Sequence, residues 1–295
     1  MLTKKHKNVL QLQTNKFVET LMVGNYKTHF KNTGIEFADF REYQDSDDAK
    51  NIDWITSSKV GKAMMKLFDE QRELDVYFLP FFWEDLNLTF NGKDKREIFE
   101  EILYILWIST IKEQNKFWSV YYDNKKINIF PLGKSNAHFH DFFNKIENNN
   151  FYQDQIILNI SQDKWNIIGN TISDKLKYFN SLKIKNNLVF LFTSDLEIDN
   201  KQLKIAALKN DLIICNVFHS FENSLEGNWI VWLKLGWKEI FIDLDNKKKK
   251  QEFQKLRKQK VIDFRKKILK SWAKYLYFDE KVNIFWELNK FFNNR

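Results

Sequence analysis

The sequence predicts an α/β fold with a mainly parallel β-sheet and helices on both faces. Three continuous apolar runs have the length and composition of strands buried on both sides, at residues 76–82, 188–193 and 212–218. Residues 117–122 and 127–130 indicate a further pair of strands joined by a short turn. Strands that alternate with helical patterns along a chain are typical of sheets built through crossover connections.

Helices are expected between these strands. Asp94 can cap one helix together with Glu97, and a stripe of isoleucine and leucine follows at helical spacing. Further helical patterns lie near 136–147, 171–182 and 200–208. Helices in these positions would cover both faces of the sheet.

The composition limits the classes of protein to which the chain can belong. The chain has 295 residues, of which 43% are hydrophobic, so it has ample material for a core. No apolar stretch approaches the ~20 residues needed to cross a bilayer, and no signal-peptide segment follows the charged start. We therefore expect a cytoplasmic protein without a transmembrane segment. The single cysteine, Cys215, lies in an apolar run and is expected to be a core thiol.

The organisation along the chain suggests three parts. Residues 1–73 hold an N-terminal helix and a charged, irregular segment, and residues 74–243 hold the α/β domain. Residues 244–295 form a basic helical extension that ends in a helix near 284–293 and packs on the core.

Basic residues outnumber acidic ones by 47 to 39, which raises the question of nucleic-acid binding. The composition is also rich in Lys, Asn, Ile and Phe, with only 2 Pro and 8 Gly, as AT-rich codons would produce. We favour this second origin for the excess of lysine. Nucleic acid is therefore not an expected partner.

The most basic segment opens at Lys247–Lys250 and is expected to continue as one amphipathic helix to about Lys274. Five apolar residues fall toward one side of that helix: Phe253, Leu256, Phe264, Ile268 and Trp272. This spacing favours a solvated basic face over a packed apolar face. Exposed aromatic residues among the lysines would instead favour nucleic acid or an anionic membrane as partner.

An ordered set of residues spans the charged segment before the α/β domain: Gly34-Ile-Glu36-Phe37, Arg41-Glu-Tyr43, Asp47-Asp48 and Ile52-Asp53-Trp54. It resembles the bacterial family called domain of unknown function 58, which carries G-x-E-F-x-x-x-R-x-Y-x-x-G-D-D-x-R-x-I-D-W before a von Willebrand factor type A-like domain. The spacing matches without a gap. Ser46 and Lys50 depart from the pattern, which has Gly and Arg there.

The resemblance implies a von Willebrand factor A-like, Rossmann-like fold and a function without catalysis. It implies an adaptor that works with MoxR-type AAA+ ATPases in assembling, maturing or remodelling client proteins. The candidate partner-binding residues in the motif are Glu36, Arg41, Asp47, Asp48, Asp53 and Trp54. The same carboxylates could instead pair with nearby basic side chains to fix an irregular loop, and both interpretations stay open.

The resemblance also implies a Mg²⁺ site, because type A domains end their first strand in D-x-S-x-S and add a Thr and an Asp from two loops. In this sequence the register aligns that triad with Phe81, Trp83 and Asp85, and the remaining positions with Thr171 and Asp195. Aromatic rings offer no oxygen ligand to Mg²⁺. We therefore expect a degenerate site without metal or other cofactor, and an Asp195 that is exposed or hydrogen-bonded.

The aromatic residues at the end of the first strand have a second interpretation. Phe81, Phe82 and Trp83 could form a hydrophobic docking spot, because open parallel sheets bind ligands at the carboxyl ends of their strands. They could equally pack under a neighbouring loop. Metal binding by His138 and His140, and acid–base chemistry by Asp47 and Asp48, are not favoured.

Overall fold

The computed structural model describes residues 36–44, 47, 49–69, 75–81, 94–112, 115–123, 126–148, 172–220, 222, 230–235, 238–243 and 246–293. The chain divides into two compact units. The small unit is His29–Glu73, and the main unit is Met1–Thr28 with Leu74–Arg295. The N-terminal helix expected within residues 1–30 lies outside the described residues.

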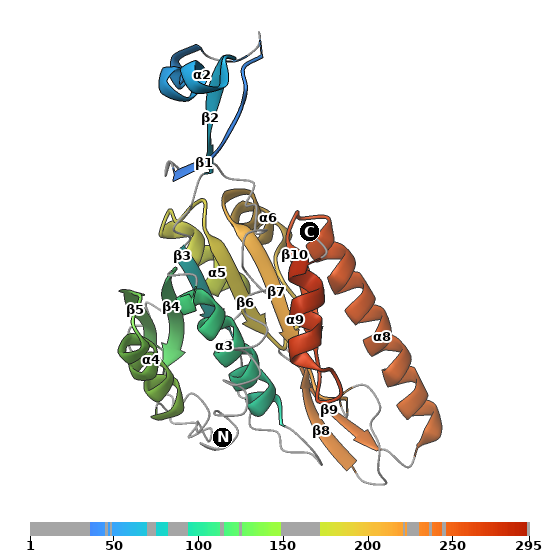
Figure 1. Cartoon of the computed structure of the whole chain (residues 1–295). Coiled ribbons are helices and arrows are strands. Elements are labelled where there is room, and N and C mark those ends of the chain that lie inside the picture. Colours follow the sequence, from blue (N-terminus) through green and yellow to red (C-terminus); the bar gives the residue numbers. More distant parts are fainter. Residues whose placement is uncertain are drawn as a thin grey trace. The chain divides into compact units, whose positions relative to one another are not determined.

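The main unit contains a six-stranded sheet (Figure 1). Its strands are β3 (Asp75–Pro80), β4 (Lys116–Asp123), β5 (Lys126–Gly133), β6 (Leu188–Thr193), β7 (Asp211–Val217) and β10 (Lys274–Phe278), in the order β10-β7-β6-β3-β4-β5. All neighbours are parallel except β5, which runs antiparallel to β4. Counted along the chain, the order is 3-2-1-4-5-6, the doubly wound arrangement. The predicted mainly parallel sheet is therefore confirmed.

Helices cover both faces of this sheet. One face is packed by α3 (Lys95–Lys112), α4 (Asn136–Asn148) and α9 (Ile284–Asn293), and the other by α5 (Ile172–Ser181), α6 (Asn200–Lys209) and α8 (Lys247–Leu269). Right-handed crossovers require this division, because the chain moves one way from β3 to β4 and the opposite way from β6 to β7 and β10. Among the described residues, no helix is long and apolar enough to cross a membrane.

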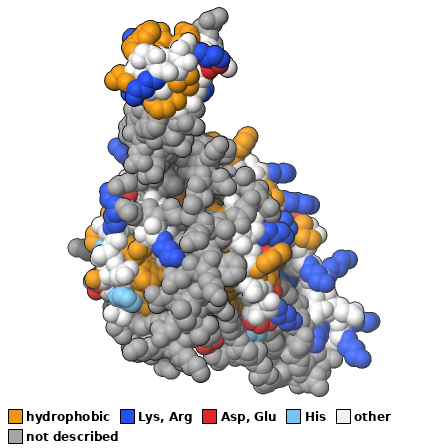
Figure 2. Space-filling model, viewed as in Figure 1, with side chains coloured by type: hydrophobic (Ala, Val, Ile, Leu, Met, Phe, Trp, Pro, Cys, Tyr) orange, Lys and Arg blue, Asp and Glu red, His pale blue; other side chains and the backbone are white. Residues whose placement is uncertain are grey.

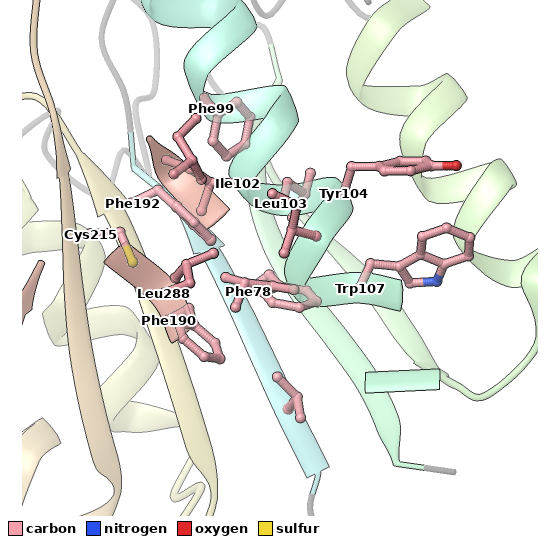
Figure 3. Packing of buried hydrophobic residues seen from close by; sticks show 14 of the residues in the cluster. Phe78, Phe99, Ile102, Leu103, Tyr104, Trp107, Phe190, Phe192, Cys215 and Leu288 are labelled. Atoms are coloured by element: carbon pink, nitrogen blue, oxygen red, sulfur yellow. The ribbon is translucent and has the colours of Figure 1, made fainter. Parts of the chain in front are cut away.

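Central strands send alternate side chains to the two faces. Phe78, Phe190 and Phe192 are fully buried beneath α3, where Phe99 and Ile102 point down onto them (Figure 3). The intervening residues of the same strands pack against α5, α6 and α8 on the other side. Burial on both faces explains why these strands are continuous apolar runs in the sequence.

Helix α3 is buried all round, so the prediction of a single buried stripe was incomplete. Tyr104 and Trp107 point away from the sheet toward α4 (Figure 3), and the Trp107 ring stacks on Phe139 with centroids 3.7 Å apart. The helix therefore packs against the sheet on one side and against its neighbour α4 on another.

Two features of the C-terminal part differ from the sequence-based expectation. The basic helix α8 ends at Leu269 rather than near Lys274, and the chain then enters the sheet as β10 beside β7. Phe264 and Ile268 are buried as expected, but Leu256 and Trp272 are exposed, so their predicted place on the buried side was wrong. An antiparallel pair, β8 (Ile230–Leu235) and β9 (Lys238–Asp243), was also not predicted.

The small unit is more regular than the sequence suggested. Strands β1 (Glu36–Glu42) and β2 (Met64–Asp69) pair antiparallel. The chain between them forms the short 3₁₀ helix η1 (Ala49–Asn51) and the helix α2 (Trp54–Val60). The expectation of an irregular segment was wrong here, because a strand pair holds both ends of the motif.

We predict that Phe190→Ala lowers the free energy of unfolding by about 3–5 kcal/mol, because it leaves a cavity at the centre of the sheet. Urea unfolding measures the loss. The control is Leu208→Ala, which truncates an exposed side chain of α6 and should change stability by less than about 0.5 kcal/mol. Equal losses in the two variants would contradict the two-sided burial of β6.

Candidate functional site

A bidentate ion pair between Arg41 and Asp47 holds the family motif in the small unit. The two guanidinium nitrogens of Arg41 donate to the two carboxylate oxygens of Asp47 over 2.7 and 2.6 Å. The backbone N–H of Gln44 donates to the same carboxylate over 3.0 Å. These contacts, led by the Arg41 hydrogen bond, hold the pKa of Asp47 below its ordinary value. The pair fixes the turn after β1, as the structural interpretation of the motif expected.

Asp53 has a structural role as the N-cap of α2. Its carboxylate accepts hydrogen bonds from the N–H of Ile55 over 3.2 Å and from the hydroxyl of Thr56 over 2.9 Å. Lys66 on β2 lies 3.7 Å from the same carboxylate. Burial alone would raise the pKa of Asp53, but these hydrogen bonds and Lys66 hold it below its ordinary value.

The other end of α2 is equally well defined. Gly61 takes a left-handed conformation with φ 74°, which glycine adopts without strain, and its N–H donates to the Ser57 carbonyl over 2.9 Å. Ser57 in turn accepts from the N–H of Met64 over 2.8 Å, which joins the helix to β2. The helix is thus fixed at both ends.

This fixed helix exposes its apolar side chains. Trp54 is 71% exposed and Ile55 is 70% exposed, and Val60 at the C-terminal end of the helix is exposed as well. Large apolar side chains in neighbouring exposed positions are typical of interaction surfaces. We call Trp54 and Ile55 the α2 patch.

The second candidate region is the carboxyl edge of the sheet, where β6 ends in Thr193-Ser194-Asp195. The buried amide of Asn216 on β7 donates to the carbonyls of Thr193 and Asp195 over 3.1 and 3.2 Å. Tyr275 on β10 donates its hydroxyl to the Asn216 carbonyl oxygen over 3.2 Å. Asp195 is half-buried. The loop after β6 is therefore held by Asn216 of the neighbouring strand β7, whose side chain is in turn held by Tyr275 of β10.

Two of the five residues that the resemblance aligns with a Mg²⁺ site are described at this edge, Phe81 and Asp195. Phe81, at the position of the first ligand, is fully buried in the core and has no oxygen side chain. The ammonium of Lys175, a buried residue of α5, lies 5.8 Å from the centre of the Phe81 ring. Among the described residues, no three His, Cys, Asp or Glu side chains gather as a metal site would require.

Several predicted residues lie outside the described part of the chain: Asp48, Phe82, Trp83, Asp85 and Thr171. Glu36 is placed as the first residue of β1. Phe81 packs in the core between the sheet and α5. Cys215 is buried as expected, and burial raises the pKa of its thiol.

A buried charge cluster at the carboxyl ends of β7 and β10 was not predicted. Glu222 pairs with Lys95 of α3 and Arg257 of α8, and all three side chains are buried. The backbone N–H of His219 donates to the same carboxylate over 3.1 Å. The cluster joins helices from opposite faces of the sheet. Its members lie far apart in the sequence, so no local pattern could reveal it.

Glu280 lies beside this cluster, in the turn after β10. Its carboxylate accepts hydrogen bonds from the hydroxyl and the N–H of Ser220, the latter over 2.9 Å. Burial alone would raise the pKa of Glu280, but these hydrogen bonds and nearby His219 hold it below its ordinary value. The turn after β10 is thereby tied to the turn after β7.

His138 also has a structural role. Its Nε2 atom lies 2.7 Å from the Pro131 carbonyl, and its ring packs against Phe117 and Phe130 at 4.9 and 4.5 Å between centroids. This leaves the ring as a packing element between β5 and α4.

We predict that Mg²⁺ and Mn²⁺ do not raise the midpoint of thermal unfolding, because a cation that binds only the folded state would raise it in proportion to occupancy. Differential scanning fluorimetry measures the midpoint, with NaCl at equal ionic strength as the control. A rise that disappears in Asp195→Ala would place a metal at the carboxyl edge and contradict the prediction.

We predict that Glu280 contributes to acid sensitivity. A carboxylate whose pKa is lowered in the folded state stabilises the fold above its unfolded pKa and loses that contribution as pH falls through the folded value. The difference in unfolding free energy between the wild type and Glu280→Gln should therefore be largest at pH 7. It should shrink below about pH 4–5, the ordinary range of glutamate.

Urea unfolding at several pH values measures this difference, with the exposed Glu197→Gln as the control for loss of one surface carboxylate. A gap between wild type and Glu280→Gln that stays constant from pH 7 to pH 3 would contradict the assignment.

Comparison with protein-family models matches residues 39–260 to the family described as protein of unknown function DUF58. No curated protein matches the chain. The matched segment begins within β1 and ends within α8, so it spans both the motif of the small unit and most of the sheet. The Arg41–Asp47 pair, the capped helix α2 and five of the six strands of the main sheet thus lie within the matched residues. The chain belongs to the DUF58 family.

Proposed function

We propose that this chain is a non-catalytic adaptor that binds other proteins, with a MoxR-type AAA+ ATPase as its partner. In this proposal the ATPase supplies the chemical work in the cytoplasm, and the adaptor recruits client proteins for assembly, maturation or remodelling. The observation that carries the proposal is the α2 patch, in which Trp54 and Ile55 are 71% and 70% exposed within the family motif.

The α2 patch has the properties of a docking surface. Tryptophan is enriched among the residues that dominate binding energy at interfaces. The Asp53 cap and the Gly61 turn fix the helix that presents it, so little conformational freedom remains to be lost on binding. Lys59 of the same helix is exposed and can meet an acidic group on a partner.

The contacts of the motif's charged residues support binding over catalysis. Arg41 and Asp47 neutralise each other, and Asp53 caps a helix. These described carboxylates are therefore engaged in structure, as expected where a charged motif serves to shape a surface.

We further propose that the main unit is a von Willebrand factor A-like domain that works without a metal. The doubly wound strand order and the motif resemblance support the first part. The second part is supported by the buried Phe81, which offers no oxygen ligand at the position that the resemblance aligns with the first one. A partner would then be held by apolar and charged side chains rather than through Mg²⁺.

The test is an affinity pull-down from the native cytoplasm with and without ATP, followed by binding measurements with the purified AAA+ ATPase that is enriched. We predict that Trp54→Ser combined with Ile55→Ser weakens that binding at least about tenfold, because exposed apolar anchors are lost. Both residues are exposed, so the thermal midpoint should stay within the error of the wild type.

The matched control is Leu208→Ser, which removes an equally exposed apolar residue of α6. Binding that is unchanged in the double variant would remove the α2 patch from the proposal. Recovery of only nucleic acid and ribosomal material in the pull-down would favour the alternative, a basic nucleic-acid-associated protein.

A further inference from the structure

The surface of α8 carries a dense positive charge. Residues 247–270 include twelve Lys or Arg and two acidic residues. Arg257 and Lys260 are used within the fold, since they pair with Glu222 and Glu197. Lys258, Arg265 and Lys266 are exposed and make no ion pair with the described residues. Figure 2 shows the Lys and Arg side chains gathered along the edge of the main unit over α8.

Apolar side chains are interleaved with these charges on one line of the helix. Lys258, Ile262, Arg265 and Leu269 are spaced at i, i+4, i+7 and i+11, so they lie on the same face. All four are exposed, while Phe264 and Ile268 on the other side are buried against the sheet. Basic and apolar side chains therefore alternate along the exposed face of α8.

Trp272 extends this line beyond the end of the helix. It is 80% exposed, although its neighbours Ser271 and Ala273 are buried. Its φ is 67°, a left-handed conformation that glycine normally supplies at the end of a helix and that is costly for a bulky aromatic residue. A strained and exposed tryptophan at such a turn points to a role outside the fold.

We propose that this outer face, formed by Lys258, Ile262, Arg265, Lys266, Leu269 and Trp272, docks on a bilayer that contains anionic phospholipids. The lysines and Arg265 match the negative headgroups, and the apolar side chains match the boundary of the hydrocarbon. Tryptophan is the side chain that concentrates at that boundary.

The side chains of this outer face favour a bilayer over nucleic acid as the partner. Single strands bind through phosphates and through aromatic rings on which bases stack. Ile262 and Leu269 have no rings to offer a base, yet they occupy the centre of the basic face. A lipid boundary accommodates aliphatic and aromatic side chains together.

The test is co-sedimentation of the full chain with vesicles of phosphatidylcholine, alone or mixed with phosphatidylglycerol. We expect binding to the mixed vesicles that weakens as salt rises, because exposed charges are screened beyond about 10 Å at 0.1 M salt. Lys258→Gln and Lys266→Gln should each reduce partitioning about fivefold.

Trp272→Gly is the decisive variant, because it should weaken binding to the vesicles without lowering the stability of the fold. Partitioning should fall about tenfold as a large apolar side chain is lost. The thermal midpoint should not fall, because glycine adopts a positive φ without strain. The matched control is Trp286→Ala, which removes an exposed tryptophan from α9 on the opposite face of the sheet and should leave partitioning unchanged.

Three outcomes would overturn the proposal. They are equal binding to pure phosphatidylcholine, no binding to either vesicle, and a loss in Trp286→Ala as large as that in Trp272→Gly. Tight binding to a short DNA duplex in the absence of vesicle binding would also overturn it, in favour of a nucleic-acid partner.

Discussion

Burial of the central strands on both faces is the constraint on which the rest of the main unit depends. Because β3, β6 and β7 direct side chains into two separate cores, both faces must be covered by helices, and the chain must cross from one face to the other. Polar groups are consequently confined to the ends of strands and to the outer sides of helices. Among the described residues of this unit, the surfaces open to a partner therefore lie at the sheet edges and on the outer sides of helices such as α8.

The carboxyl edge of the sheet holds buried charged groups, which must be paired because they have lost their contact with water. Glu222, Lys95 and Arg257 are charges removed from water, and such charges stabilise a fold only when they are well paired. Their pairing joins α3 on one face to α8 on the other. Arg257 is thereby held within the fold, and the opposite side of α8 is presented on a rigid element. A surface built on a fixed helix loses little conformational freedom when it binds.

The sequence predicted much of this architecture, because long apolar runs and helical spacing reflect burial directly. β6 was placed to the residue, and α5 and α9 to within one residue. The end of α8 was missed, because Trp272 continues the helical spacing and stands at a turn where glycine would have signalled a stop. In the small unit, the Arg41–Asp47 pair was among the expected possibilities. The exposure of Trp54 could not be predicted from the spacing of apolar residues, since it depends on how α2 lies against β2.

The two proposed surfaces differ in physical character, so their contributions can be separated. The α2 patch is mainly apolar, and its binding should depend on shape and desolvation, which salt affects little. Half of the six residues of the outer face of α8 are basic, so binding through this face should weaken as ionic strength rises. Raising the salt concentration should therefore weaken binding through the outer face of α8 more than binding through the α2 patch. Since Trp54 and Trp272 also belong to different compact units, substitution of one should leave the fold around the other intact.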